Sequence, residues 1–213
     1  SFAVWAPNAV RVSVVGNFNE WDGRRHAMHR MPMSGIFELF IPGVKVGDIY
    51  KYELKLKGNR IELKSDPYAA CTEVPPAGAS VVADTGAFQW EDEEWMAGRK
   101  KFADRKQPVS IYETSLTDWK DGEELVEFVK KLNYTHVELH PVMEYLDDEA
   151  GEYSTFAYYA PTRRFGMPQD FQKTVNELHK AGIGLILDWT PSHFPRVEGG
   201  LELFDGTPLY ENP

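Results

Sequence analysis

The chain has 213 residues, with 33 acidic against 23 basic side chains and a net charge of −10. This balance argues against a nucleic-acid ligand, because no surplus of basic side chains can displace the counterions of a phosphate backbone. The composition is 42% hydrophobic and 13% aromatic, which suits a packed core. No apolar run approaches the roughly 18 residues that cross a bilayer. We therefore expect a globular protein with a neutral or weakly polar ligand, and neither a nucleic-acid nor a membrane partner.

Cys71 is the single cysteine, so a disulfide within the chain is excluded. A lone cysteine predicts a reducing, cytoplasmic setting. The chain begins at Ser1 without a methionine or a leader and ends at Pro213 after a turn-rich stretch. We interpret both ends as cut, so the chain is expected to be a fragment.

Residues 1–85 read as a small antiparallel β-sandwich. Apolar residues repeat with a period of two in three runs, and turn signals separate the runs. The runs lie in 10–14, 37–41 and 50–56, and the turn signals include Pro42-Gly43 and Gly58-Asn59. Residues 86–107 read as a linker, in which Phe88, Trp90 and Trp95 stand among acidic residues and are expected to pack on a neighbouring domain.

From Pro108 the pattern changes to strands that alternate with helices. Strands are predicted at 109–113, 135–139 and 184–188. Asp121 resembles an N-cap, Pro168 fits a first helical turn, and Gly182 fits a helix stop. The order β-α-β-α-β predicts a parallel sheet with right-handed crossovers.

Residues 108–213 therefore resemble the first three units of a (β/α)8 barrel. A complete barrel takes about 250 residues, so this one would be truncated, with open sheet edges. Such edges promote association. We expect self-association through them, and poor solubility or partial disorder beyond about residue 108 when the chain is alone. A sharp, monomeric, cooperative unfolding transition that reports on both halves would contradict this expectation.

Asp188 and His193 are the first candidates for a site. The third strand delivers Asp188 to its carboxyl end, where parallel barrels place their active sites, and His193 follows in the next loop. Pro191 restricts the backbone between them. A carboxylate can orient donors and an imidazole can donate to a sugar hydroxyl, although an aspartate at a strand end can equally cap a turn.

Residues 153–166 are predicted to form a loop at the same mouth, where tyrosines can stack on sugar rings. For Tyr158 and Tyr159 we favour simple packing of this loop. Glu138 and Glu144 could form a carboxylate pair, but their placement on one strand and its exit favours structural or solvated roles. The histidines form no evident metal site, because no third ligand accompanies them; these are His26, His29, His136 and His140.

Several stretches resemble glycogen (1,4-α-glucan) branching enzymes of the α-amylase superfamily. Residues 2–8 and 14–23 resemble the glycogen-binding type β-sandwich that precedes the barrel in that family. The barrel stretches are 135–142, 160–166 and Leu187–Phe194, followed by Phe204–Glu211, the most branching-enzyme-like of all. The match extends over essentially the whole chain.

The resemblance implies roles for particular residues. Asp188 would support the active site, His193 would contact the sugar beside the scissile bond, and Tyr153 would stack on that sugar. Trp21 and Lys51 match positions that contact glucan in related modules. The second tryptophan typical of those modules is absent near Gly58-Asn59, so a structural role for the sandwich stays equally open.

Glu152 stands where the family usually has glycine, and His140 replaces a commoner apolar residue before Pro141. By the resemblance, the nucleophile, the acid–base residue and the third carboxylate come from strands beyond Pro213. No catalytic residue is therefore assigned here, and no cofactor or metal is implied. The parent enzyme would transfer α-1,4 glucan chains to 6-hydroxyls, while this fragment alone is expected to be inactive.

Two other functions stay open. The chain could be a non-catalytic glucan-binding module with a truncated barrel attached. It could also come from another superfamily member, such as a debranching or trehalose-releasing enzyme, although Trp189, Pro191 and the loop 204–211 argue against that reading.

Overall fold

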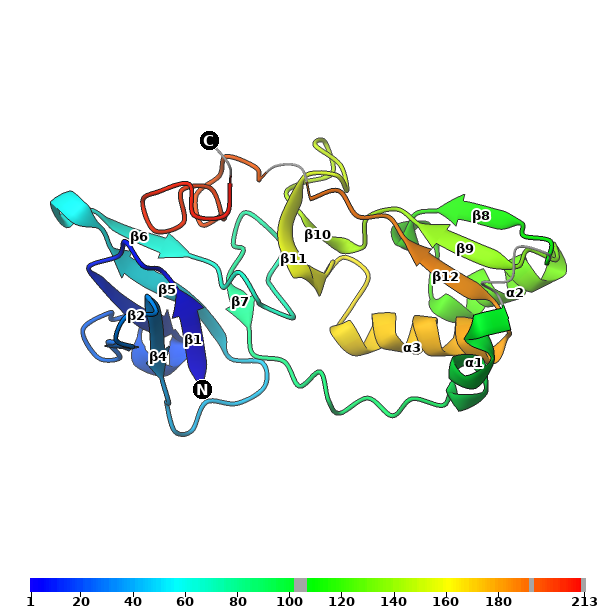
Figure 1. Cartoon of the computed structure of the whole chain (residues 1–213), viewed down its shortest axis with the longest axis horizontal. Helices are drawn as coiled ribbons and strands as arrows, with labels where there is room; N and C mark the ends of the chain where they lie inside the picture. The colour runs from blue at the N-terminus through cyan, green and yellow to red at the C-terminus, as the bar shows by residue number, and fades with distance from the viewer. Residues whose placement is uncertain (102–106, 192–193, 212–213) are drawn as a thin grey trace. The chain divides into compact units, whose positions relative to one another are not determined.

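The computed structural model describes residues 1–101, 107–191 and 194–211 (Figure 1). Its contacts divide the chain into two compact units. We call Ser1–Asp84, Met143–Ala160 and Ser192–Pro213 the sandwich unit, and Thr85–Val142 with Pro161–Pro191 the sheet–helix unit. In the part of the chain that is described, every helix is too short or too polar to traverse a bilayer.

The sandwich unit is built from two antiparallel sheets. One sheet has the strand order β1-β4-β3, and the other has the order β2-β5-β6 with β7 also paired to β5. The strands are β1 (Phe2–Trp5), β2 (Arg11–Gly16), β3 (His29–Arg30), β4 (Ile36–Leu39), β5 (Ile49–Lys55), β6 (Ile61–Lys64) and β7 (Ser80–Val81). The predicted β-sandwich is thereby confirmed.

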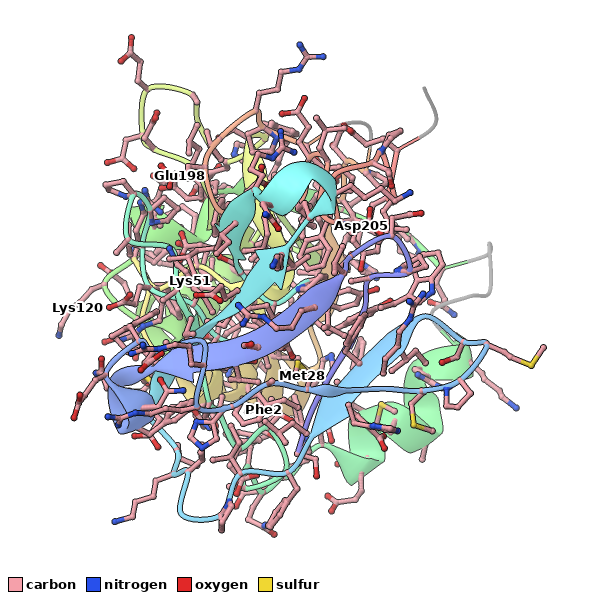
Figure 2. The ribbon with its side chains drawn as sticks, turned by 90° about the vertical axis from the view of Figure 1, so that its left-hand side faces the viewer. Phe2, Met28, Lys51, Lys120, Glu198 and Asp205 are labelled. Carbon is pink, nitrogen blue, oxygen red and sulfur yellow. The ribbon has the colours of Figure 1, made fainter. Side chains whose placement is uncertain are left out.

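The core of this unit follows from the period of two in its strands. Alternate residues of a strand share one face, so Val12 and Val14 of β2 turn inward together, as do Tyr52 and Leu54 of β5. Phe2 and Met28, labelled in Figure 2, belong to the same core. Phe204 and Leu201 also join it, so residues from the far end of the chain complete the sandwich core.

Residues 143–161 form two paired strands, β10 (Met143–Tyr145) and β11 (Thr155–Pro161). The prediction of a loop over 153–166 is therefore wrong for β11. Four of its seven residues are buried. Tyr158 packs on Phe194, with ring centroids 5.5 Å apart, and Tyr159 stacks on Tyr68 at 5.3 Å. These residues therefore form a partly buried strand and not the exposed loop that was expected.

The sheet–helix unit contains the predicted alternation of strands and helices. Its parallel strands have the order β12-β9-β8. The elements are α1 (Glu93–Gly98), β8 (Ile111–Thr114), α2 (Gly122–Lys131), β9 (His136–Leu139), α3 (Pro168–Lys180) and β12 (Gly184–Leu187). An α/β arrangement after the sandwich is thus confirmed.

Local signals place both crossover helices where they were predicted. Asp121 caps α2 by accepting a hydrogen bond from the backbone N–H of Glu124 at 3.0 Å, which satisfies one of the unpaired donors at a helix start. Pro168 opens α3. Gly182, two residues after α3, has a φ of 73°, a left-handed conformation that glycine adopts without strain.

Three linker residues, Glu91, Asp92 and Trp95, pack against α3 within the sheet–helix unit. The ring of Trp95 stacks on His179, with centroids 4.9 Å apart and planes at 16°. Nδ1 of His179 lies 2.7 Å from a carboxylate oxygen of Asp92, and Lys180 pairs with Glu91 at 2.9 Å. Aromatic and ionic contacts together fix this segment along one helix.

Candidate functional site

The carboxyl end of the parallel sheet carries the ionisable residues expected of a site. Glu113 of β8 lies beside Glu138 of β9, which lies beside Ile186 of β12. Tyr112, next to Glu113, packs against Phe128 of α2 with ring centroids 5.2 Å apart. Because neighbours in a strand point to opposite faces, the two glutamates lie on the face away from α2. We call this the helix-free face.

Asp188 continues this arrangement beyond β12. Its backbone N–H donates to the carbonyl of Leu139 at 2.9 Å, which extends the strand ladder by one residue. Strand alternation then places Asp188 on the same face as Ile186, hence on the helix-free face. Its side chain is half-buried. The predicted position at the carboxyl end of a parallel strand is therefore the one that the structure shows.

His140 and Glu113 meet at the same end of the sheet. Nε2 of His140 lies 3.2 Å from a carboxylate oxygen of Glu113, while the backbone N–H of His140 donates to Thr114 at 3.0 Å. Sequence reasoning noticed His140 as an unusual residue before Pro141 but missed Glu113. The signal that could have revealed it was its position near the end of the first predicted strand.

Glycine at position 184 allows a histidine ring to lie over the start of β12. A Cβ atom there would stand 2.2 Å from Cδ2 of His136, and Gly184 pairs with His136 across the ladder. Nδ1 of this ring lies 2.8 Å from the hydroxyl of Thr135. Among the described residues, no group of three or more histidine, cysteine or acidic side chains is placed to hold a metal ion.

Tyr153 lies in the sandwich unit, between β10 and β11, and is 46% exposed. Asp188 lies in the sheet–helix unit, and His193 lies outside the described residues. Tyr153 and Asp188 thus belong to different units, and a common site for the three predicted residues stays a prediction. Glu144, the other candidate carboxylate near the second strand, is fully buried in β10 and so has the structural character that was favoured for it.

Trp21 and Lys51 are the candidate glucan contacts on the sandwich. The backbone N–H of Trp21 donates to Gly16 at 3.0 Å, and its indole N–H donates to the side chain of Asn17 at 2.9 Å. These bonds hold the ring in a turn just after β2, where it is 36% exposed. Lys51 is opposite Val15, one step along the same strand pair from Gly16. The turn that carries Trp21 is thus bonded to Gly16, which neighbours the residue opposite Lys51 in the ladder.

Different contacts surround the side chains of Lys51 and Trp21. A Cβ atom on Gly199 would lie 3.8 Å from Nζ of Lys51, so the segment near Gly199 runs close to this ammonium group; Lys51 and Glu198 are both labelled in Figure 2. Beside Trp21, the guanidinium of Arg24 hydrogen-bonds to Asp22 and holds the pKa of that carboxyl below its usual range. The tryptophan is therefore carried by a turn with its own internal ion pair.

Comparison with known proteins first defines a class. Residues 1–69 match the family described as "Carbohydrate-binding module 48 (Isoamylase N-terminal domain)". A crystal structure described as a "Putative alpha Amylase from Salmonella typhimurium" superposes with a TM-score of 0.72 at 22% identity, covering 93% of this chain and 32% of that one. The fold of this chain is accordingly similar to that of part of this crystal structure, and its leading sandwich matches the carbohydrate-binding module 48 family.

Comparison with curated proteins identifies a narrower group of relatives than the fold does. The chain is 46% identical to the 1,4-alpha-glucan branching enzyme GlgB of Cellvibrio japonicus over 99% of its own length. It is 48% identical to the GlgB proteins of Cereibacter sphaeroides and Pseudomonas aeruginosa, over 100% and 99% of its length. It spans 30% of each of these relatives. The resemblance to branching enzymes is thereby confirmed.

Proposed function

We propose that this chain is the sandwich and barrel-start portion of a 1,4-α-glucan branching enzyme. The observation that carries the proposal is identity of 46–48% to such enzymes over 99–100% of the chain. The position of Asp188 supports it, because barrel enzymes place functional side chains at the carboxyl ends of their strands. The whole enzyme would cut an α-1,4 glucan and transfer the cut chain to a 6-hydroxyl.

The roles that we propose for these residues follow from the mechanism of retaining glycoside chemistry. Retaining glycoside chemistry needs a nucleophile and an acid about 5 Å apart across the scissile bond. We assign neither role within these residues. Tyr153, Asp188 and His193 would instead hold the sugar next to that bond. For the whole enzyme we also propose the domain ranges 1–85, 86–107 and 108–213, the last as the first three units of an eight-stranded barrel, although in the structure of this chain Met143–Ala160 and Ser192–Pro213 group with the sandwich unit.

Two further features belong to the proposal. Self-association through the outer edges of β8 and β12 would give the unpaired backbone groups of those strands a partner. The single cysteine, Cys71, which is buried, fits a cytoplasmic setting, where thiols stay reduced.

A chimera tests the proposal. Residues 1–213 would replace the matched segment of the Cellvibrio japonicus enzyme, and branching would be followed by the loss of amylose–iodine colour. We expect the chimera to branch amylose, because the matched segments are 46% identical. A chimera that folds, as judged by circular dichroism and a cooperative melt, but branches no amylose would refute the proposal. The unmodified relative serves as the control.

Glucan binding by the sandwich is a second candidate function, favoured by the family match over residues 1–69. Trp21 and Lys51 are the residues proposed to make the contact. Affinity electrophoresis of the chain in glycogen-containing gels tests this, with Trp21→Ala as the comparison. Retardation that depends on Trp21 is the expected result, while unretarded migration of the unmodified chain would eliminate this function.

A further inference from the structure

A pocket of about 480 Å³ opens in the sandwich unit, and none of the candidate site residues discussed so far lines it. Its size lies within the range of small-molecule sites, roughly 300–1,000 Å³. The wall is formed by Ser1–Ala3, the loop after β4, the core end of β5, the segment around Asp66 and the residues that follow β7. Trp21 and Lys51 do not line it.

One lining residue of the pocket, Asp66, is a half-buried carboxylate held by tyrosine hydroxyls. Oδ2 of Asp66 accepts hydrogen bonds from the hydroxyls of Tyr50 at 2.7 Å and Tyr52 at 3.2 Å. Oδ1 accepts the backbone N–H of Tyr68 at 2.8 Å. Burial raises the pKa of Asp66, and these hydrogen bonds oppose the rise. A carboxylate oxygen has two lone-pair directions, so Oδ1 keeps capacity to accept one more donor.

The rim of the pocket is aromatic. Phe40 is 70% exposed and Tyr68 is 63% exposed, although both line the pocket. The ring of Tyr159 stacks on Tyr68 at an interplanar angle of 26°, which restrains the orientation of the Tyr68 ring. Large exposed aromatics next to buried polar groups are typical of a binding site rather than of bare surface.

We propose that this pocket binds a glucose unit of an α-glucan, as a sugar site separate from Trp21 and Lys51. A pyranose ring offers an apolar C–H face to stack on Tyr68 or Phe40, and hydroxyl donors that Asp66 can accept. The carboxylate would repel a phosphate or another anion. A divalent cation is disfavoured because no cluster of three ligating side chains occurs among the described residues. The inference rests on the proposed function only for the identity of the sugar.

Binding of maltohexaose to the whole 213-residue chain, measured by isothermal titration calorimetry, tests this site. Tyr68→Ala and Phe40→Ala each remove an exposed ring and are expected to weaken binding about tenfold, the effect of losing one favourable stacking contact. Trp90→Ala removes an exposed ring from the other unit and should change nothing. Near-ultraviolet circular dichroism verifies that each variant keeps its sandwich core.

The decisive comparison is between this pocket and the proposed glucan contact at Trp21 and Lys51. Weakening by Tyr68→Ala and Phe40→Ala, while Trp90→Ala binds as the unmodified chain does, supports the pocket whether or not Trp21→Ala also weakens binding. Loss of binding only in Trp21→Ala overturns the pocket but leaves glucan binding by the sandwich intact. Absence of maltohexaose binding in the unmodified chain overturns the pocket, while branching by the chimera would still uphold the proposed enzyme.

Discussion

Asp205 accepts hydrogen bonds from both the backbone N–H and the side-chain amide of Asn8, at 2.9 and 3.0 Å, across 197 residues of sequence. Thr207 donates a third hydrogen bond to the same carboxyl group at 2.6 Å. Asp205, labelled in Figure 2, is nearly fully buried, and the adjacent Phe204 is fully buried in the sandwich core. The stretch that most resembles branching enzymes is thus an integral part of the sandwich unit.

Asp205→Ala should destabilise the sandwich unit by about 1–3 kcal/mol, because it removes the acceptor of the backbone N–H of the half-buried Asn8 and one of the two acceptors of its side-chain amide. Urea unfolding followed by near-ultraviolet circular dichroism measures the loss. Glu198→Ala, an exposed acidic residue of the same segment, should change the free energy of unfolding by no more than about 0.5 kcal/mol. Equal effects of the two substitutions would show that the hydrogen bonds between Asp205 and Asn8 contribute nothing to the free energy of unfolding.

The sandwich unit should lose stability above pH 10. Burial, reinforced by the nearby Asp66 carboxylate, raises the pKa of Tyr50 and Tyr52 above their ordinary value of 10.0. Above that pH the unfolded chain releases these protons while the folded chain keeps them, so the free energy of unfolding falls as the pH rises. Each tyrosine can contribute a slope of about 1.4 kcal/mol per pH unit.

Urea unfolding at pH 8, 10 and 11 gives this slope, and Tyr50→Phe isolates the share of one phenol. The variant should lose stability less steeply between pH 10 and 11 than the unmodified chain. If both proteins show the same slope, Tyr50 does not titrate as its surroundings require.

Gly184→Ala should destabilise the sheet–helix unit by about 1–3 kcal/mol, because the added methyl group would clash with the ring of His136. Hydrogen exchange of the amides in α3 reports on this unit. In the double variant with His136→Ala the clash is absent, so the cost of the added methyl group should largely disappear. An equal cost in the presence and absence of the histidine ring would contradict the packing described for the helix-free face.

The isolated chain should show no branching activity. Neither of the two catalytic groups of a retaining mechanism is assigned within it, so no covalent intermediate should form on any of its carboxylates. Incubation with amylose followed by iodine staining provides the measurement, and the Cellvibrio japonicus enzyme is the positive control. Any turnover that withstands further purification would refute this assignment of roles.

Local patterns in the sequence were sufficient for the elements that carry their own signals. The period of two in β2 and β5, the cap at Asp121 and the glycine at 182 each act within a few residues, so they could be predicted. The strand β11 and the docking of Phe204 could not, because they depend on partners distant in the chain. The contact between Asn8 and Asp205 leaves no local trace at either residue.

The candidate site, like the fold, could be predicted from the sequence only in part. The position of Asp188 at a strand end follows from an apolar run that stops at a carboxylate, and this was predicted. The meeting of His140 with Glu113 depends on which strands become neighbours, so it emerged only from the sheet register. A common site for Tyr153, Asp188 and His193 stays a prediction.

The role of Asp188 is tested most directly in the chimera. Asp188→Asn keeps the size of the side chain but removes its charge, and Glu113→Gln does the same for an exposed carboxylate at the same end of the sheet. We expect kcat/KM for branching of amylose to fall about a hundredfold in Asp188→Asn, the scale for losing one electrostatic contact in an active site, and to change less than threefold in Glu113→Gln. A folded Asp188→Asn chimera with unchanged kcat/KM would contradict the placement of the sugar site at the carboxyl end of β12.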